Sequence, residues 1–213
     1  MKSLTNYINE KLIVNKNYNQ YIYVPKSFYE LRKIIKDRYE KLGPGTEQDP
    51  VDFNDIDVSN IDSFYIDDKG LFEGTQFKYI DISEWDVLNI KSMNSMFFDC
   101  KELKSVGDLS SWDVSNVTDM SFMFCDCNCL NPDVSSWDVS NVTDMSSMFY
   151  HCKKFNQDIS SWNVSDVTDM SFMFQGCESF NQDISGWNVY KVMKKINMFD
   201  GCSIKDEYKP KFK

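Results

Sequence analysis

The chain has 213 residues, a formal net charge of −10 and seven cysteines. Residues 1–48 carry nine Lys/Arg against five Asp/Glu, whereas residues 49–213 carry fourteen against twenty-eight. Because nucleic-acid affinity depends on neutralising phosphates with Lys and Arg, the acidic part argues against nucleic-acid binding. The sequence also contains no run of about eighteen or more apolar residues, so we expect no membrane span.

The N-terminal residues lack the apolar core and the small-residue cleavage site of a secretory signal, so we expect a cytosolic protein. Leu4, Ile8 and Leu12 fall at helical spacing. This pattern leaves open a docking peptide at residues 1–12, of the kind that would suit a virion-associated protein or a component of a cell envelope. The peptide weakly resembles those that direct proteins into phage heads.

The next segment predicts a small cap at residues 1–48. Residues 11–14 and 21–24 have the composition of two short strands, and residues 25–42 have the apolar spacing of a helix. Pro25 or Ser27 begins this helix, and Gly43-Pro44-Gly45 ends it. Residues 43–50 are predicted to be a linker.

The rest of the chain is an internal repeat. Its tryptophans are separated by 27, 25, 25 and 25 residues, and they are Trp85, Trp112, Trp137, Trp162 and Trp187. Positions are counted from each tryptophan. Position 2 is always Val, and positions 11 and 12 are always Met-Phe. A repeat of this length indicates units that bury their apolar faces by stacking on one another.

Each unit predicts one short strand and one short helix. In the unit of Trp137, positions 8, 11, 12 and 15 have the i, i+3, i+4, i+7 spacing of a helix; they are Met145, Met148, Phe149 and Cys152. Thr143 is a suitable N-cap, and residues 157–162 alternate like a half-buried strand. The predicted fold class is therefore α/β: a leucine-rich-repeat-like solenoid of about six strand-turn-helix units with a small α+β N-terminal cap.

The repeats are predicted to span residues 49–202. The first unit is degenerate, with Ile56 at the tryptophan position, and the last carries Lys194 and Lys195 where other units have Asp and Met. These two units are expected to close the stack. The remaining residues, 203–213, are rich in lysine and are expected to be frayed.

The pattern D-I-S-x-W-[DN]-V-S-[ND]-V-T-D-M-S-x-M-F-x-x-C resembles the 25-residue repeat of BspA-like leucine-rich-repeat surface proteins, which also occurs in mycoplasma surface lipoproteins. The resemblance covers roughly residues 56–202. It implies a protein-binding molecule, often an adhesin at a cell surface, and it brings no catalytic residues. We therefore expect a non-catalytic, protein-binding module and no cofactor.

The cysteines have two interpretations. Those at position 15 are predicted to form a buried ladder; they are Cys100, Cys127, Cys152, Cys177 and Cys202. Cys125, Cys127 and Cys129 form a C-x-C-x-C stretch, which leaves metal binding as the weaker alternative because the spacing matches no zinc template. The odd number of cysteines argues against structural disulfides.

The aspartate four residues before each tryptophan also repeats, and we expect it to cap turns rather than bind calcium. His151, the only histidine, is expected to be a helix-surface residue. No nucleophile-base spacing and no phosphate-binding glycine loop is present, so the sequence predicts no enzymatic activity.

Binding is expected where the repeats differ. Positions 10 and 13 hold four aromatic residues that we call the aromatic strip: Phe98, Phe122, Tyr150 and Phe172. Exposed aromatic residues are typical of interface hot spots, whereas burial by neighbouring helices is the alternative. A second candidate is the strand face with Asp158, Ser160 and Asp183. The partner is predicted to be another protein, and the oligomeric state stays open.

Overall fold

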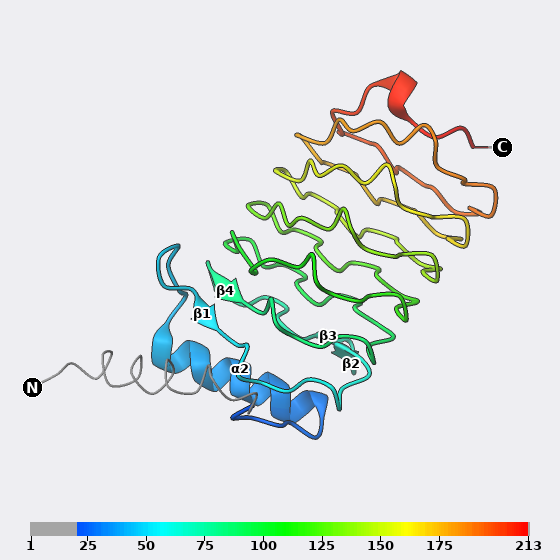
Figure 1. The fold of residues 1–213 in the computed structure, drawn as a ribbon. Coiled ribbons are helices and arrows are strands. Elements are labelled where there is room, and N and C mark those ends of the chain that lie inside the picture. The colour runs from blue at the N-terminus through cyan, green and yellow to red at the C-terminus, as the bar shows by residue number, and fades with distance from the viewer. Residues whose placement is uncertain (1–20, 213) are drawn as a thin grey trace, which may run out of the picture.

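The computed structural model describes residues 21–212 and shows the repeats as coils stacked one on another (Figure 1). We call one repeat a coil. Parallel bridges join equivalent residues of successive coils, and they are Ser63–Ser92, Ser92–Asp119, Asp119–Asp144, Asp144–Asp169 and Asp169–Lys194. The spacing between the tryptophans is therefore the length of chain that completes one coil.

The predicted fold class is wrong, because the coils contain no strand-turn-helix units. Within residues 21–212 the only α-helix is α2 (Phe28–Leu42), which precedes the coils, and the only 3-10 helix is η1 (Asp206–Tyr208). The strands have two residues each: β1 (Val51–Asp52) is parallel to β4 (Ile80–Asp81), and β2 (Tyr65–Ile66) is antiparallel to β3 (Lys69–Gly70). Most of each coil consists of turns.

Two left-handed residues in each coil explain why the helix does not form. In the coil of Trp137, Ser147 and His151 have φ values of 55°. A right-handed helix cannot continue through such residues. The predicted cap also has another use, since the Thr143 hydroxyl donates to the Thr118 carbonyl at 3.1 Å. The four residues of the predicted stripe are buried, but in a turn rather than in a helix.

Backbone amides in this part of the coil bond to the next coil. We call the amides at positions 8, 10, 12 and 14 the ladder amides. In the coil of Trp137 the donors are Met145, Ser147, Phe149 and His151, and the acceptors are the carbonyls of Asp169, Ser171, Met173 and Gln175, at 2.7–3.0 Å. The same four positions donate from the coils of Trp85, Trp112 and Trp162. The ladder satisfies polar groups that a helix would have paired internally.

Stacked aromatic rings fill the core. The phenylalanines of position 12 are nearly parallel between coils: the Phe97–Phe124 and Phe124–Phe149 centroids are 5.5 and 5.7 Å apart, with interplanar angles of 4° and 8°. Each tryptophan donates its ring N–H to the preceding coil, as Trp137 does to the Leu109 carbonyl at 3.0 Å. Both arrays require identical residues at fixed positions, which explains the invariance of the repeat.

The predicted N-terminal helix is present as α2, which begins after the Ser27 cap and ends at Gly43. Phe28, Leu31 and Ile35 are buried. The helix lies across the end of the first coil (Figure 1). Of the predicted strands, residues 11–14 lie outside the described residues, and residues 21–24 contribute a single bridge between Tyr23 and Ile56.

The predicted linker is packed against the coils. The Pro44 carbonyl accepts from the Lys78 amide at 2.7 Å. Gly45 has a φ of 75°, and a Cβ atom there would lie 2.2 Å from the Tyr79 carbonyl oxygen. Glycine is therefore required at this close approach.

The C-terminal residues are packed rather than frayed. Ile204 and Pro210 are buried. The Tyr208 carbonyl accepts from the Ile184 amide at 3.0 Å, and the Lys209 ammonium lies 5.6 Å from the centre of the Phe199 ring. Residues 203–212 thus cover the tryptophan side of the last coil. Among residues 21–212, no helix has the length and hydropathy needed to cross a membrane.

Candidate protein-binding surface

The aromatic strip comes from the turns of the ladder. Phe122 and Phe172 stand at position 10 and have φ values of 57° and 61°. The residues on either side of each phenylalanine, at positions 9 and 11, are buried. The left-handed turn directs the Phe122 and Phe172 side chains away from the core, whereas the smaller Ser147 at the same position is buried.

The structure leaves part of the aromatic strip accessible. Phe122 is 39% exposed, whereas Phe98, Tyr150 and Phe172 are half-buried. The rings of Phe98 and Phe122 pack edge to face with centroids 6.4 Å apart. The centroids of the Tyr150 and His151 rings are 3.9 Å apart. The strip thus consists of one aromatic pair and two further rings on the following coils. Among residues 21–212 no helix covers the strip, although the neighbouring coils leave three of its four rings half-buried.

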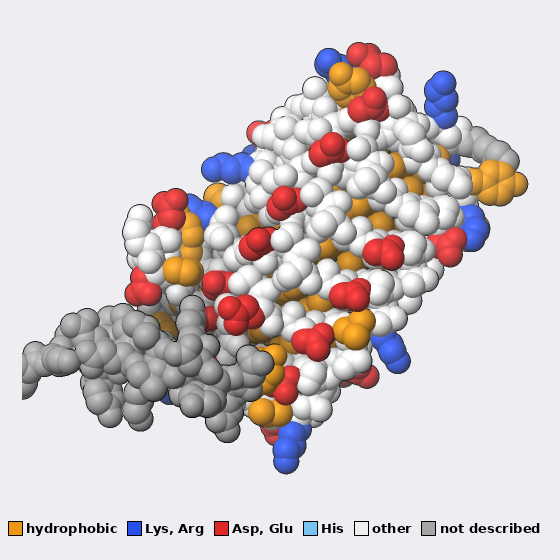
Figure 2. Space-filling view, viewed as in Figure 1, with side chains coloured by type: hydrophobic (Ala, Val, Ile, Leu, Met, Phe, Trp, Pro, Cys, Tyr) orange, Lys and Arg blue, Asp and Glu red, His pale blue; other side chains and the backbone are white. Residues whose placement is uncertain are grey.

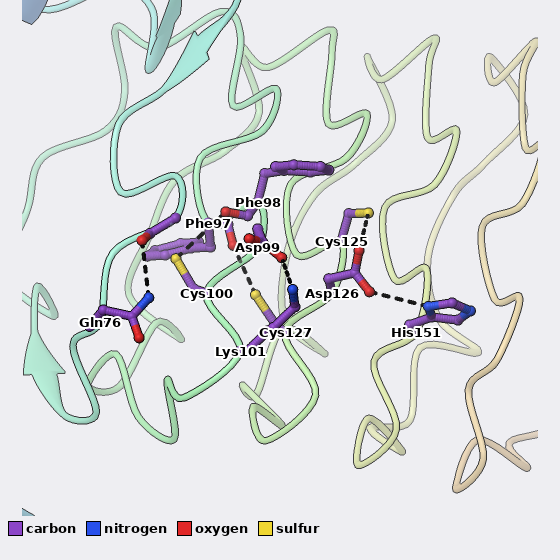
Figure 3. A network of polar contacts seen from close by, with 11 residues as sticks. Gln76, Phe97, Phe98, Asp99, Cys100, Lys101, Cys125, Asp126, Cys127 and His151 are labelled. Carbon is purple, nitrogen blue, oxygen red and sulfur yellow. Dashed lines mark hydrogen bonds and ion pairs between the residues drawn. The ribbon is translucent and has the colours of Figure 1, made fainter.

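A row of polar side chains borders the strip at position 14 (Figure 3). His151 Nδ1 lies 3.2 Å from Asp126 Oδ1, and Lys101 Nζ lies 2.7 Å from Asp99 Oδ1. The hydrogen bond to Asp99 raises the pKa of Lys101. This row was not predicted, because His151 was assigned to a helix surface. Aligning the repeats does place Asp126 and His151 at one position, which is the signal that could have identified the pair.

The second candidate, the Asp158, Ser160 and Asp183 surface, is a set of turns. Asp158 Oδ1 accepts from the Ser160 amide and Asp183 Oδ1 from the Ser185 amide, each at 3.0 Å. The three side chains are exposed. They precede the tryptophans and do not join the aromatic strip. The capping role predicted for these aspartates is confirmed.

The capped aspartates predict a pH dependence. Hydrogen bonds from the Ser160 and Ser185 side chains and amides hold the pKa values of Asp158 and Asp183 below their usual range. A carboxylate whose pKa is lower in the folded state stabilises the fold above its unfolded pKa, about 3.9, and this contribution is lost as the pH falls further. Urea unfolding midpoints should therefore change little between about pH 7 and 5 and fall below about pH 4.

Asparagine provides the control for that measurement. Asn163 already caps the Ser165 amide at 3.2 Å, so asparagine keeps the turn without titrating. The double variant Asp158→Asn/Asp183→Asn should show a shallower acid loss than the unmodified chain. Identical acid profiles would contradict the contribution of these two turns.

The predicted cysteine ladder is confirmed. Cys100, Cys127, Cys152 and Cys177 are buried, and Cys202 is half-buried. The thiols donate to carbonyls of the preceding coil, for example Cys127 to Phe97 at 3.0 Å and Cys152 to Phe124 at 2.9 Å. Cys127 is therefore engaged in the stack rather than directed at Cys125 and Cys129. Within residues 21–212, no three Cys, His, Asp or Glu side chains are arranged to hold a metal ion.

Thiol labelling should separate these environments. Burial raises the pKa of Cys100 to about 11 and that of Cys125 to about 12, and it also raises the pKa values of Cys127, Cys152 and Cys177. Because the thiolate is the nucleophile, alkylation of the folded chain at about pH 8 should be fastest at the half-buried Cys129 and slower at Cys202, which is half-buried but whose pKa burial also raises. Mass spectrometry should find all seven thiols labelled in urea, and rapid native labelling of Cys127 would contradict the buried ladder.

The surface charge agrees with the sequence. On the face drawn in Figure 2, carboxylates follow the stack in rows from the first coils to the last. The strip thus lies on a protein whose coils are acidic, which disfavours phosphate-bearing partners. The chemistry available at this surface is aromatic packing together with the hydrogen bonds and charges of position 14.

Comparison with known proteins identifies the repeat. The family described as "Mycoplasma protein of unknown function, DUF285" matches residues 47–139 and 118–207, which together cover most of the chain. No curated protein and no solved structure matches the chain. The two overlapping matches contain the coils described above, and the chain belongs to the DUF285 family.

Proposed function

We propose that this protein is a non-catalytic binding module that recognises another protein through the aromatic strip and the polar row beside it. The observation that carries the proposal is the exposure of Phe122, which packs edge to face on Phe98 at the surface. Phe, Tyr and Trp are enriched at the centres of protein interfaces, and Tyr is also enriched among hot spots. The resemblance of the repeat to BspA-like surface proteins, which bind other proteins, supports the same function.

The scaffold suits such a role. Invariant positions build the core and the ladder, so substitutions there would break the stack. Positions 10 and 13 vary between Phe, Ser, Tyr, Cys, Gln, Asn and Asp without changing the course of the chain. Ser147 and Cys125 are buried, but the larger side chains at these positions reach the surface and are free to be specific for a partner. The stacked coils hold these side chains at fixed places along the stack, which lowers the entropy that binding must overcome.

The test uses a partner captured from the source cells and then purified. The triple variant Phe122→Ala/Tyr150→Ala/Phe172→Ala should weaken its binding by at least about tenfold, since hot-spot truncations cost about 2 kcal/mol or more. Leu88→Ala is the matched control because Leu88 is also exposed, at 42%, but lies outside the strip. Both variants should melt cooperatively near the temperature of the unmodified chain. Unchanged affinity in a folded triple variant would overturn the proposal.

A further inference from the structure

The last described coil differs from the others, because its ladder amides have no partner within residues 21–212. In the four preceding coils the amides at positions 8, 10, 12 and 14 donate to the next coil. The equivalent amides in the last coil have no acceptor among residues 21–212, and they belong to Lys195, Asn197, Phe199 and Gly201. We call this row the open edge. It presents four hydrogen-bond donors in the arrangement that binds a coil elsewhere in the stack.

The C-terminal segment covers part of the last coil. Residues 203–212 cover its tryptophan side, through the Ile184 to Tyr208 hydrogen bond and the burial of Pro210. The last phenylalanine of position 12, Phe199, is covered by the Lys209 ammonium. Phe212 of the same segment does reach this edge, because Lys195 Nζ lies 4.8 Å from the centre of its ring. The amides of Asn197, Phe199 and Gly201 have no acceptor among residues 21–212.

The side chains at the open edge are apolar where earlier coils are polar. Met193 stands at position 6, which is Thr in the three preceding coils, and it is 79% exposed. Ile196 stands at position 9, where the three preceding coils have Ser, and it is 61% exposed. A terminal coil that faces only water is expected to be polar on its outer side. Apolar substitutions in the last described coil indicate a surface that becomes covered.

The positive charge of the C-terminal end favours an acidic partner. Residues 188–213 carry seven lysines and three acidic residues, whereas residues 49–187 carry seven lysines and twenty-five acidic residues. Lys191 pairs with Asp166 at 2.6 Å, and Lys194 pairs with Asp169 at 3.2 Å, so these lysines already contact aspartates of the coil below. A segment with carboxylates at the same spacing would meet the same lysines from the other side.

A second copy of the chain does not fit this edge. Two open edges facing each other would oppose mostly donors with donors, because each presents four N–H groups beside a single equivalent acceptor, the Met193 carbonyl at position 6. In a head-to-tail arrangement the first coil would have to offer its carbonyls, but the β2–β3 hairpin interrupts that side and the Gly70 carbonyl accepts from Arg32 at 3.0 Å. Among these arrangements, the one that fits is a different chain that supplies carbonyl acceptors.

We infer that the open edge binds an extended acidic segment of another protein, which adds to the stack as one further half-coil. The backbone carbonyls of that segment accept from the four amides, its apolar side chains cover Met193 and Ile196, and its carboxylates pair with Lys191 and Lys194. This site is separate from the aromatic strip and does not depend on the function proposed for it.

The probe is a fluorescent synthetic peptide with the sequence NVSDVTDMSFMFQG, which is that of residues 163–176 and carries the ladder acceptors and two aspartates. Added to the full chain, it should slow amide exchange at Asn197 and Phe199 by about tenfold or more. Exchange at Phe172 and Phe174, already bonded to the last coil, should not change. A peptide with both aspartates replaced by lysine should bind at least about tenfold more weakly.

Two protein variants localise the binding. Ile196→Asp should weaken binding of the peptide by about tenfold. Its melting temperature should not change, because the Ile196 side chain is mostly exposed. Leu88→Asp, at an exposed position outside the edge, should bind normally. Unchanged exchange at the edge amides, or equal binding by both variants, would overturn the site. Concentration-dependent self-association that protects the same amides would show that the occupant is a second copy and would overturn the choice of partner.

Discussion

Replacing Phe149 with alanine is expected to lower the free energy of unfolding by about 3–5 kcal/mol. The ring is completely buried and lies between Phe124 and Phe174, with centroids 5.7 and 5.8 Å away, while Phe155 stacks on it at 3.8 Å. Truncation leaves a cavity in the middle of the stack, and each coil contacts only its neighbours, so the loss falls on two junctions at once. Urea denaturation followed by tryptophan fluorescence measures the effect.

Phe122→Ala serves as the control for this substitution. It removes the same number of atoms from a ring that is partly exposed, so the loss should be about 1 kcal/mol or less. Equal losses at Phe149 and Phe122 would contradict the assignment of position 12 to the core and of position 10 to the surface.

Arg38→Ala is expected to destabilise the junction between α2 and the first coil by about 3 kcal/mol. The guanidinium binds both carboxylate oxygens of Asp55, at 2.7 and 3.1 Å, and also donates to the Asp52 carbonyl. It lies 5.0 Å from the centre of the Phe53 ring. Removing it leaves the mostly buried Asp55 without its partner, a loss that exceeds the value of an ordinary surface pair.

Lys36→Ala is the matched control, because Lys36 is on the same helix and its pair with Glu40 is exposed and 3.9 Å long. Such a pair contributes about 0.5 kcal/mol or less. Hydrogen exchange should show faster opening of α2 in Arg38→Ala than in Lys36→Ala, with the later coils unaffected in both. Similar exchange of α2 in the two variants would contradict the role given to Arg38.

Part of the fold follows from the sequence because stacking demands identity at fixed positions. The tryptophan and Met-Phe positions identify buried residues, and Val139 and Val142 at positions 2 and 5 are buried as well. The helix at residues 28–42 has its cap and its terminating glycine in the sequence. In both cases a local pattern and a tertiary requirement agree.

The turn structure of the coil did not follow, because its apolar spacing is also that of a helix. Positions 8, 11, 12 and 15 point inward in the coil only because positions 10 and 14 are left-handed. Gly176 and Gly201 occupy position 14 in the last two coils and have φ values of 71° and 66°. Glycine recurring there was the available signal for a left-handed residue, whereas Asp126 and His151 at the same position concealed it.

The candidate site was predicted in composition but not in exposure. Periodicity places Phe122 and Phe172 away from the Met-Phe positions, and the structure does so as well. Which rings stay accessible depends on how closely the neighbouring coils approach them, and this distance cannot be read from the sequence. The last unit was expected to close the stack, and the open edge departs from that prediction. The ladder is a backbone feature that the side chains do not specify.

Photo-cross-linking tests the proposed binding surface most directly. A benzophenone amino acid would replace Phe122 in one variant and Leu88 in another, both at exposed positions, and each full-length protein would be irradiated in the source cells. The account predicts a defined cross-linked protein from position 122 and none from position 88. A cross-link to the same protein from position 88 alone, with position 122 silent in a folded variant, would contradict binding through the aromatic strip.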